Sequence, residues 1–165
     1  NSDDYISSEG GFVKVKGMDI STIAPVGLQQ KWIMPVKGSI SSPYGYRIHP
    51  ITRKRKFHKG IDIAARKNTP VKATQNGSVY KTLTTSQSGG YGNYVELYHG
   101  KVNGKDVYSS YAHLNSISTS IGRVINQGDL IGYVGSTGNS TGPHLHFEIK
   151  ENGAAVNPLN YVSIK

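Results

Sequence analysis

Short runs of β-branched and aromatic residues, each closed by glycine, asparagine, aspartate or proline, follow one another from residue 69 to residue 150. Runs of this kind favour strands, and the residues that close them favour tight turns. No segment carries apolar side chains at a helical spacing over a useful length. The sequence therefore predicts a mainly β fold with little helix.

Six segments show the strand pattern most clearly: 69–74, 76–83, 93–100, 105–114, 122–135 and 144–150. The third and fourth are separated by a stretch that contains Asn103-Gly104. Because this dipeptide is a strong signal for a tight turn, we expect the two segments to form a hairpin.

Residues 1–30 differ from the rest because they are polar, rich in turn-forming residues and without clean periodicity. We interpret them as a linker or N-terminal extension, with one short strand at 12–17, and expect them to be the least ordered region. Residues 31–165 then form one domain that is long enough to bury a core. The chain starts without Met and without a signal pattern, so we expect it to be a monomeric domain of a larger protein.

The basic character of the chain favours a polyanionic partner, since 19 Lys and Arg residues against 10 Asp and Glu give a formal net charge of +9. The chain lacks a helix-turn-helix pattern, a zinc-finger spacing and an aromatic RNA-binding signature, so we expect no nucleic-acid partner. It also lacks a run of about 20 apolar residues, so we expect no membrane span. The charge alone does not choose between an anionic membrane surface and an anionic cell-wall polymer. The basic run 53–56 is either a solvated loop or a patch that steers substrate.

The segment 142–149 places two histidines, His144 and His146, at alternate positions of an apolar strand. Side chains at alternate positions share one face of a sheet, so both imidazoles face the same way while Leu145 and Phe147 point into a core. Two neighbouring histidines on one strand face are rarely explained by packing alone.

A second segment places His58 four residues before Asp62. On a continuous strand these two side chains share a face with Gly60, while Ile61 and Ile63 point into the core. The same spacing also occurs in ordinary ion pairs that bind no metal.

An imidazole and a carboxylate from this segment, with an imidazole from 144–146, make a set of three ligands of the kind that catalytic zinc uses. Such zinc keeps its fourth position for water. Because the chain has no cysteine, a structural site closed by thiolates is excluded. Two histidines and one carboxylate also suit ferrous iron, although nothing else in the chain indicates an oxidative cosubstrate.

Four segments, 47–65, 90–100, 109–114 and 132–149, resemble in order and form the signature blocks of lysostaphin- and LytM-type zinc metallopeptidases. Members of that family cleave peptide bonds in bacterial peptidoglycan. The resemblance runs from about Trp32 to Tyr161. It implies an antiparallel β-sheet groove built on a duplicated hybrid motif, with Zn²⁺ as the cofactor.

The resemblance also implies a role for five residues. His58, Asp62 and His146 are expected to bind the zinc, and His113 and His144 to be the catalytic pair beside it. Zinc lowers the pKa of bound water and polarises a carbonyl, while a histidine can take a proton and return it to a leaving amine. No HExxH motif supplies a glutamate base. Which of the two histidines is the base stays open.

Two further residues, Tyr46 and Asn93, match family positions that tend to line the substrate groove, and each is equally well explained as structural. The loops within 82–93 and 98–114 are expected to wall the groove and to set specificity.

The remaining histidines, His49 and His99, stand at apparent strand ends, and we interpret them as structural. Glu148 lies two residues beyond His146 and therefore on the same strand face, which makes it a candidate partner for that imidazole.

The predicted function is hydrolysis of peptidoglycan peptides, with cross-links from D-Ala to diaminopimelate favoured over glycine bridges. The expected location is extracellular or in the cell wall, or on a virion if the domain comes from a phage lysin; an autolysin is the other expected source. The basic charge would hold anionic wall polymers. The alternative function is a non-catalytic module that binds the cell wall or activates an amidase, but relatives of that kind typically lose ligand residues.

Overall fold

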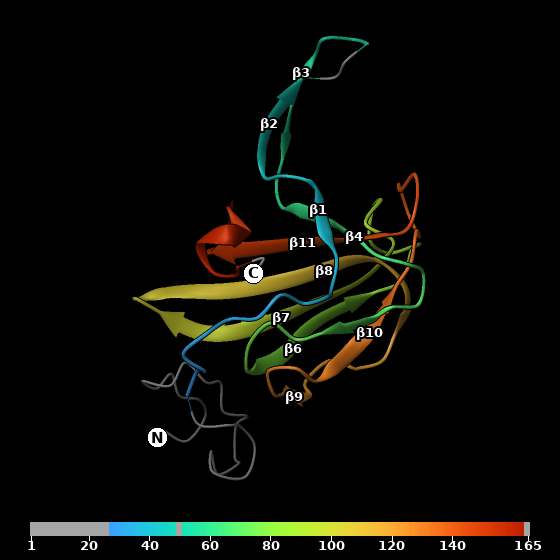
Figure 1. Ribbon diagram of the computed structural model, residues 1–165. Coiled ribbons are helices and arrows are strands. Elements are labelled where there is room, and N and C mark those ends of the chain that lie inside the picture. The colour runs from blue at the N-terminus through green and yellow to red at the C-terminus, as the bar shows by residue number, and fades with distance from the viewer. Residues whose placement is uncertain (1–26, 49–50, 164–165) are drawn as a thin grey trace.

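The computed structural model describes residues 27–48 and 51–163 (Figure 1). The strand predicted at 12–17 and the role predicted for His49 lie outside these ranges. Within them the chain forms twelve strands: β1 (Ser39–Ser42), β2 (Gly45–Ile48), β3 (Arg55–His58), β4 (Ile61–Ala64), β5 (Pro70–Lys72), β6 (Gly77–Leu83), β7 (Asn93–Val102), β8 (Lys105–Ile117), β9 (Val124–Ile125), β10 (Leu130–Val134), β11 (His144–Glu151) and β12 (Ala154–Val156). The only helical element among the described residues is a 3-10 turn at Pro158–Asn160.

The prediction of a mainly β fold is therefore confirmed, and each of the six predicted strand segments contains observed strand. Ten strands form one antiparallel sheet whose main path runs β1-β4-β11-β8-β7-β6-β9. Off this path, β10 pairs with β5 and β8, and β12 pairs with β11. The long strand β8 lies between β11 and β7 and connects the two halves of the sheet (Figure 1).

Strands β2 and β3 form a separate two-stranded sheet. Figure 1 shows this hairpin standing away from the main body, above the end of β1 and the start of β4. We call residues 45–58 the arm. It joins the body at His58, which ends β3 three residues before β4 begins at Ile61.

The core confirms the predicted strand faces. Ile61 and Ile63 of β4 and Leu145 and Phe147 of β11 are all fully buried. They pack in one apolar cluster with residues from every long strand of the main sheet. Because one face of β4 and β11 is buried in this way, the alternate residues of both strands must point to the other face.

The predicted hairpin turn between β7 and β8 is also confirmed. Asn103 and Gly104 both adopt positive φ, 52° and 81°, as a two-residue turn of type I′ requires. Glycine adopts this backbone without strain, and asparagine tolerates it better than most residues.

The segment 57–65 differs from the continuous strand predicted for it, because β3 ends at His58 and β4 begins at Ile61. The reason lies at Gly60, where the backbone presses against β11. A Cβ atom at this position would lie 2.3 Å from the carbonyl oxygen of Phe147. The chain therefore changes sheets at Gly60, and His58 meets Asp62 across a junction between two sheets.

Residues 27–30, placed in the predicted N-terminal extension, make hydrogen bonds to the body. The backbone N–H of Gln29 donates to the Gln75 side chain, whose amide donates back to the Gln29 carbonyl. The Asn76 side chain donates to the carbonyl of Gly27. A domain boundary near residue 31 stays a prediction.

Candidate metal centre

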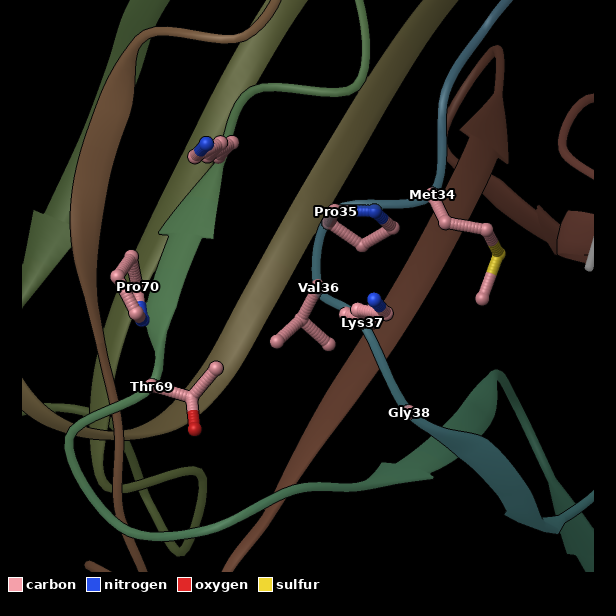
Figure 2. Close-up of a pocket in the computed structure, with 8 residues that line it drawn as sticks. Met34, Pro35, Val36, Lys37, Gly38, Thr69 and Pro70 are labelled. Carbon is pink, nitrogen blue, oxygen red and sulfur yellow. The ribbon is translucent and has the colours of Figure 1, made fainter.

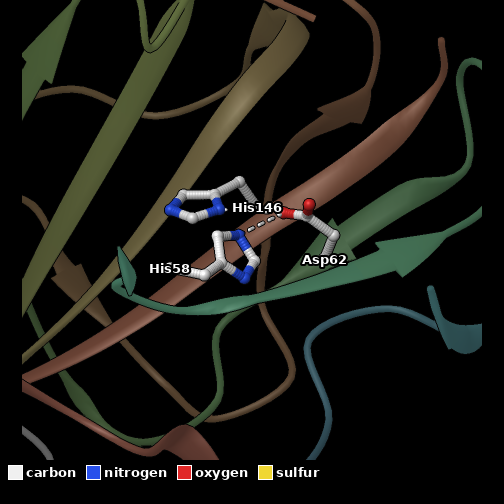
Figure 3. Close-up of side chains that lie close together, drawn as sticks. All are labelled: His58, Asp62 and His146. Carbon is white, nitrogen blue, oxygen red and sulfur yellow. Dashed lines mark hydrogen bonds and ion pairs between the residues drawn. The ribbon is translucent and has the colours of Figure 1, made fainter. Parts of the chain in front are cut away.

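His58, Asp62 and His146 offer three ligand atoms that all lie within 4.8 Å of one another (Figure 3). The carboxylate oxygen Oδ1 of Asp62 lies 3.3 Å from Nε2 of His58 and 2.9 Å from Nδ1 of His146. Within residues 27–48 and 51–163 it is the only cluster of three or more residues that could hold a metal ion. The structure thus brings together the three residues that the sequence suggested as ligands.

Strand register explains how Asp62 and His146 meet. They are directly opposite each other in the antiparallel β4-β11 pair, so their side chains rise from the same face at adjacent points. That face is the one turned away from the apolar core. His58 enters from the end of the arm and completes the cluster.

Hydrogen bonds to the outer nitrogens orient both imidazoles. Nδ1 of His58 lies 2.8 Å from the carbonyl oxygen of Pro43, which can only accept, so Nδ1 carries a proton and Nε2 is the nitrogen that faces Asp62. Nε2 of His146 lies 2.8 Å from Oε2 of Glu148, so in this ring Nδ1 is the nitrogen that faces Asp62. Outer partners of this kind fix the tautomer of metal-binding histidines.

Electrostatics support an ionised carboxylate between the rings. Burial raises the pKa of Asp62, but hydrogen bonds with His146 and His58 outweigh burial and hold that pKa well below its ordinary value. Burial lowers the pKa of His146, yet hydrogen bonds with Asp62 and Glu148 raise it to about 9. Burial also raises the pKa of Glu148, and the hydrogen bond with His146 more than offsets this, so Glu148 too is ionised. At neutral pH the cation that these two carboxylates hold is thus the His146 imidazolium, and a metal ion bound here would replace its Nδ1 proton.

The donor set fits zinc. With zinc–ligand bonds of about 2.0–2.2 Å in a tetrahedral arrangement, neighbouring ligand atoms stand about 3.3 Å apart. The two separations measured from Asp62 Oδ1, 2.9 and 3.3 Å, are close to this value. Two nitrogens and one oxygen leave a fourth position for water or substrate, as in catalytic zinc sites.

The two histidines predicted as a catalytic pair lie beside the cluster. The ring centroids of His113 and His144 are 5.1 Å apart, and Nε2 of His144 is 3.7 Å from Asp62 Oδ1. Nδ1 of His113 donates to the Thr137 carbonyl at 2.7 Å, and Nδ1 of His144 donates to the Gly142 carbonyl at 2.9 Å. Each ring therefore keeps Nε2 available for proton transfer.

His113 reaches this place through an irregularity in β8. Ala112 is directly opposite His146, so in a regular strand His113 would point to the apolar face. Instead, its φ is 63°, and the β7 residues 93–95 stand against the β8 residues 111–114. This β-bulge carries an extra residue and turns His113 toward the cluster of His58, Asp62 and His146, as bulges next to active sites commonly do.

Burial lowers the pKa of His113, and the neighbouring imidazoles of His144 and His146 lower it further. Its ring is therefore neutral near pH 7, with an unprotonated Nε2. A neutral imidazole in this position can accept a proton.

The cluster lies in an open groove of about 500 Å³. One wall is the base of the arm, and the other is made by the loops 84–92 and 135–143. The two loops hold each other, since the backbone N–H of Asn139 donates to the carbonyl of Gly90 and the hydroxyl of Thr137 accepts from the N–H of Asn93. The expectation that 82–93 walls the groove agrees with Gly89, Gly90 and Tyr91 lining it.

A larger cavity, about 610 Å³, lies elsewhere (Figure 2). Its lining is Met34, Pro35, Val36, Lys37, Gly38, Thr69, Pro70 and Lys72. It contains neither histidine nor carboxylate. The smaller groove holds four histidines and Asp62 close together, and we therefore place the chemistry there.

Three features that the sequence placed at the groove lie elsewhere in the structure. Among the described residues that line the groove, neither Tyr46 nor Asn93 occurs. Tyr46 is 64 % exposed on the arm, and the Asn93 side chain donates to the carbonyls of Leu114 and Asn115, a structural role. The hairpin within 98–114 turns at the end of β8 remote from His113, about 26 Å along the strand, and does not wall the groove.

Two other expectations agree with the contacts. Glu148 is the partner of His146. His99 is fully buried within β7, between the Asn76 carbonyl and the Ser109 hydroxyl, although it stands inside the strand and not at its end. The sequence could not predict which backbone carbonyls orient the histidine rings, because every residue has a carbonyl. In the structure they are those of Pro43, Thr137 and Gly142.

Comparison with known proteins gives one family. The family model described as "Peptidase family M23" matches residues 56–158. The DD-carboxypeptidase/endopeptidase Mpg of Neisseria gonorrhoeae is 49% identical over 121 residues, 73% of this chain and 26% of that protein. The peptidoglycan DD-endopeptidase ShyA of Vibrio cholerae is 35% identical over 131 residues, 79% of this chain and 29% of that protein. The chain thus spans about a quarter of the length of these relatives.

Solved structures agree. A zinc-containing peptidase from Vibrio cholerae superposes with a TM-score of 0.69 at 30% identity, over 78% of this chain and 39% of that one. The catalytic domain of lysostaphin from Staphylococcus simulans superposes with a TM-score of 0.58 at 32% identity, over 77% of this chain and 91% of that one. In the described residues no helix is long and apolar enough to cross a membrane.

Proposed function

This chain belongs to peptidase family M23, a family of metallopeptidases, and we propose that it is a zinc-dependent endopeptidase that hydrolyses peptide cross-links of bacterial peptidoglycan. The observation that carries the proposal is the cluster of His58, Asp62 and His146 in an open groove, with two further imidazoles beside it. Catalytic zinc sites need three protein ligands and a nearby group that transfers protons.

We assign the metal to Nε2 of His58, the carboxylate of Asp62 and Nδ1 of His146. When bound, Zn²⁺ supplies a Lewis acid for the scissile carbonyl and lowers the pKa of a bound water. The chain's own contribution is to hold the three ligand atoms together and to keep the two outer nitrogens of the histidines engaged. The alternative ferrous ion uses the same ligands, and metal analysis of protein purified without added metal distinguishes the two.

We assign proton transfer to His113 and His144. Both rings present Nε2 to the groove, and both are held through Nδ1 by backbone carbonyls that do not titrate. One takes the proton of the attacking water and one returns a proton to the leaving amine, and which performs which step stays open. The fixed orientation keeps these nitrogens in place without a cost in side-chain entropy at each turnover.

For the substrate we propose a bond of the D-Ala-to-diaminopimelate type. One relative is named DD-carboxypeptidase/endopeptidase Mpg, and another is named peptidoglycan DD-endopeptidase ShyA. Because the chain covers only part of these proteins, the substrate of the whole protein is part of the proposal.

We further propose that the chain is a monomeric domain of a longer protein that works outside the cell or in the cell wall. Its net charge of +9 would hold anionic wall polymers. An origin in a phage lysin or on a virion stays a prediction.

The experiment is to add the protein to purified diaminopimelate-type and pentaglycine-type cell walls, with and without a chelator, and to analyse the released fragments by mass. We expect new peptide ends from the diaminopimelate-type wall that appear only when zinc is bound. If neither wall releases fragments although zinc is bound, the endopeptidase assignment fails and a non-catalytic wall-binding module takes its place.

A further inference from the structure

The arm has two chemically different faces. In the β2-β3 pair, Gly45 is opposite His58 and Arg47 is opposite Lys56. Directly opposite residues of an antiparallel pair share a face, and so do alternate residues along each strand. Arg47 and Lys56 therefore lie on the face that carries His58, one step further from the body. Gly45 places no side chain beside His58.

The other face of the arm is aromatic. Tyr46 and Phe57 are opposite each other there, with ring centroids 4.8 Å apart, and the guanidinium of Arg55 lies 4.2 Å from the centre of the Tyr46 ring. Arg55 therefore has a partner on the far side of the arm. Arg47 and Lys56 line the groove.

The groove-side cations lack an anionic partner in the part of the chain that the structure describes. Arg47 donates to the hydroxyl of Ser42, and neither Arg47 nor Lys56 lies within ion-pair distance of a described carboxylate. The two acids of the groove, Asp62 and Glu148, are already engaged by histidines. The groove therefore has a cationic wall that can accept an anion from the substrate.

The cationic wall lies close enough to His58 to contact a substrate charge that is next to the scissile bond. Same-face positions on a strand are about 7 Å apart, so Arg47 and Lys56 begin one such step from the His58 position. Because both side chains are long, their charged ends can lie several ångströms from these backbone positions. An α-carboxylate on the residue that supplies the scissile nitrogen is only two bonds from that nitrogen.

Resting on the function proposed above, we propose that Arg47 and Lys56 bind the free α-carboxylate of the residue that supplies the scissile amide nitrogen. In a D-Ala-to-diaminopimelate cross-link that residue carries such a carboxylate beside the bond. Within a glycine bridge the same position is an uncharged amide. The planar guanidinium of Arg47 suits two parallel hydrogen bonds to a carboxylate, and Lys56 adds a second charge. The cationic wall would thus select the diaminopimelate-type bond.

The test uses two synthetic cross-linked peptides that differ only at this carboxylate, which is free in one and a carboxamide in the other. For the unmodified enzyme we expect kcat/KM to fall about tenfold to a hundredfold on amidation, the range of a charge-assisted hydrogen bond. Arg47→Gln should lower kcat/KM on the free acid by a similar factor and leave little discrimination between the peptides. Lys56→Gln should act in the same direction.

Arg55→Gln is the matched control, because it removes a cation of the same arm on the opposite face, and it should keep full discrimination. Zinc content should be unchanged in all three variants, since none replaces a proposed ligand. Two outcomes overturn the inference. One is equal cleavage of both peptides by the unmodified enzyme. The other is full discrimination between the peptides in each of the two single variants, Arg47→Gln and Lys56→Gln. Cleavage of neither peptide by the zinc-loaded enzyme overturns the proposed function instead.

Discussion

The Oε2 atom of Glu148 lies 2.8 Å from Nε2 of His146, on the side of the ring opposite to Asp62. Glu148 is 2 % exposed, and its other contact at this oxygen is the Tyr91 hydroxyl, which donates to it. A buried and ionised carboxylate can only accept from Nε2–H, so Nδ1 of His146 is the nitrogen that faces Asp62.

Replacing Glu148 by Gln should weaken zinc binding about tenfold, since outer partners of metal-binding histidines contribute about 10- to 100-fold in affinity. The shape of the side chain is kept, so the β-sheet should remain folded. Competition for zinc with a coloured chelator measures the affinity. Glu96→Gln is the control, because Glu96 is equally buried but accepts from Tyr94 and does not contact His146. Equal affinities of both variants would contradict this role of Glu148.

His146→Ala and Asp62→Ala should each lose both bound zinc and peptidase activity. Each removes one of three proposed ligands, so the loss of zinc affinity should exceed the roughly 100-fold that outer partners contribute. Metal analysis after gel filtration, with activity on purified cell walls, measures both. A variant that keeps stoichiometric zinc would remove that residue from the ligand set.

His113→Ala should lose activity about 100-fold or more while keeping its zinc, because general acid–base catalysis contributes about 10²–10⁴-fold. The ring of His113 lies 6.1 Å from that of His146 and is held by the Thr137 carbonyl, outside the three-ligand cluster. Zinc content and activity are measured on the same preparation. Loss of zinc in this variant would show that the division into ligands and catalysts is wrong.

Removal of zinc by a chelator should abolish activity and leave the β-sheet folded, because the fully buried core forms without the metal ligands. The ion should nevertheless stabilise the chain, by about 4 kcal/mol when free zinc is 1,000 times its Kd. Circular dichroism and thermal unfolding with and without zinc measure these effects. Activity should return when zinc is added. Unfolding on chelation would indicate a structural metal.

His99 should make the folded protein less stable as the pH falls from about 6.5 to about 4. Burial lowers its pKa to about 4, against about 6.5 in an unfolded chain, and the hydrogen bond with the Asn76 carbonyl only partly offsets this. The unfolded chain then binds more protons in this window, and the free energy of unfolding should fall by roughly 3 kcal/mol. Above pH 6.5 the full contribution is present.

Urea unfolding at pH 7 and pH 4.5, for the unmodified chain and for His99→Gln, checks this dependence. The variant should be less stable at pH 7, since it disturbs the contacts with Asn76 and Ser109, but its stability should change less with pH. The same pH dependence in both chains would assign the acid sensitivity to other groups.

The strand pattern was readable from the sequence because it is local. Alternation along 144–150 predicted that Leu145 and Phe147 would be buried and that His144 and His146 would share the other face, and the structure agrees. The turn at Asn103-Gly104 was equally predictable, since its backbone preference belongs to the dipeptide itself.

The path from His58 to Asp62 was not predictable in the same way. The sequence suggested one continuous strand, whereas close contact between Gly60 and the backbone of Phe147 divides it between two sheets. The bulge that turns His113 into the groove likewise depends on how β8 pairs with β7. Both features arise from contacts between segments far apart in the chain.

By itself, then, the sequence determined the mainly β fold and the faces of β11, because side-chain type and strand periodicity are properties of short segments. The same patterns offered His58, Asp62 and one histidine of 144–146 as ligands, and the resemblance to a known family singled out His146. Only the tertiary structure decided which nitrogen of each ring faces the cluster and which cations face the groove. Those depend on backbone carbonyls, on strand register and on the direction of the arm, which exist only after distant segments have packed together.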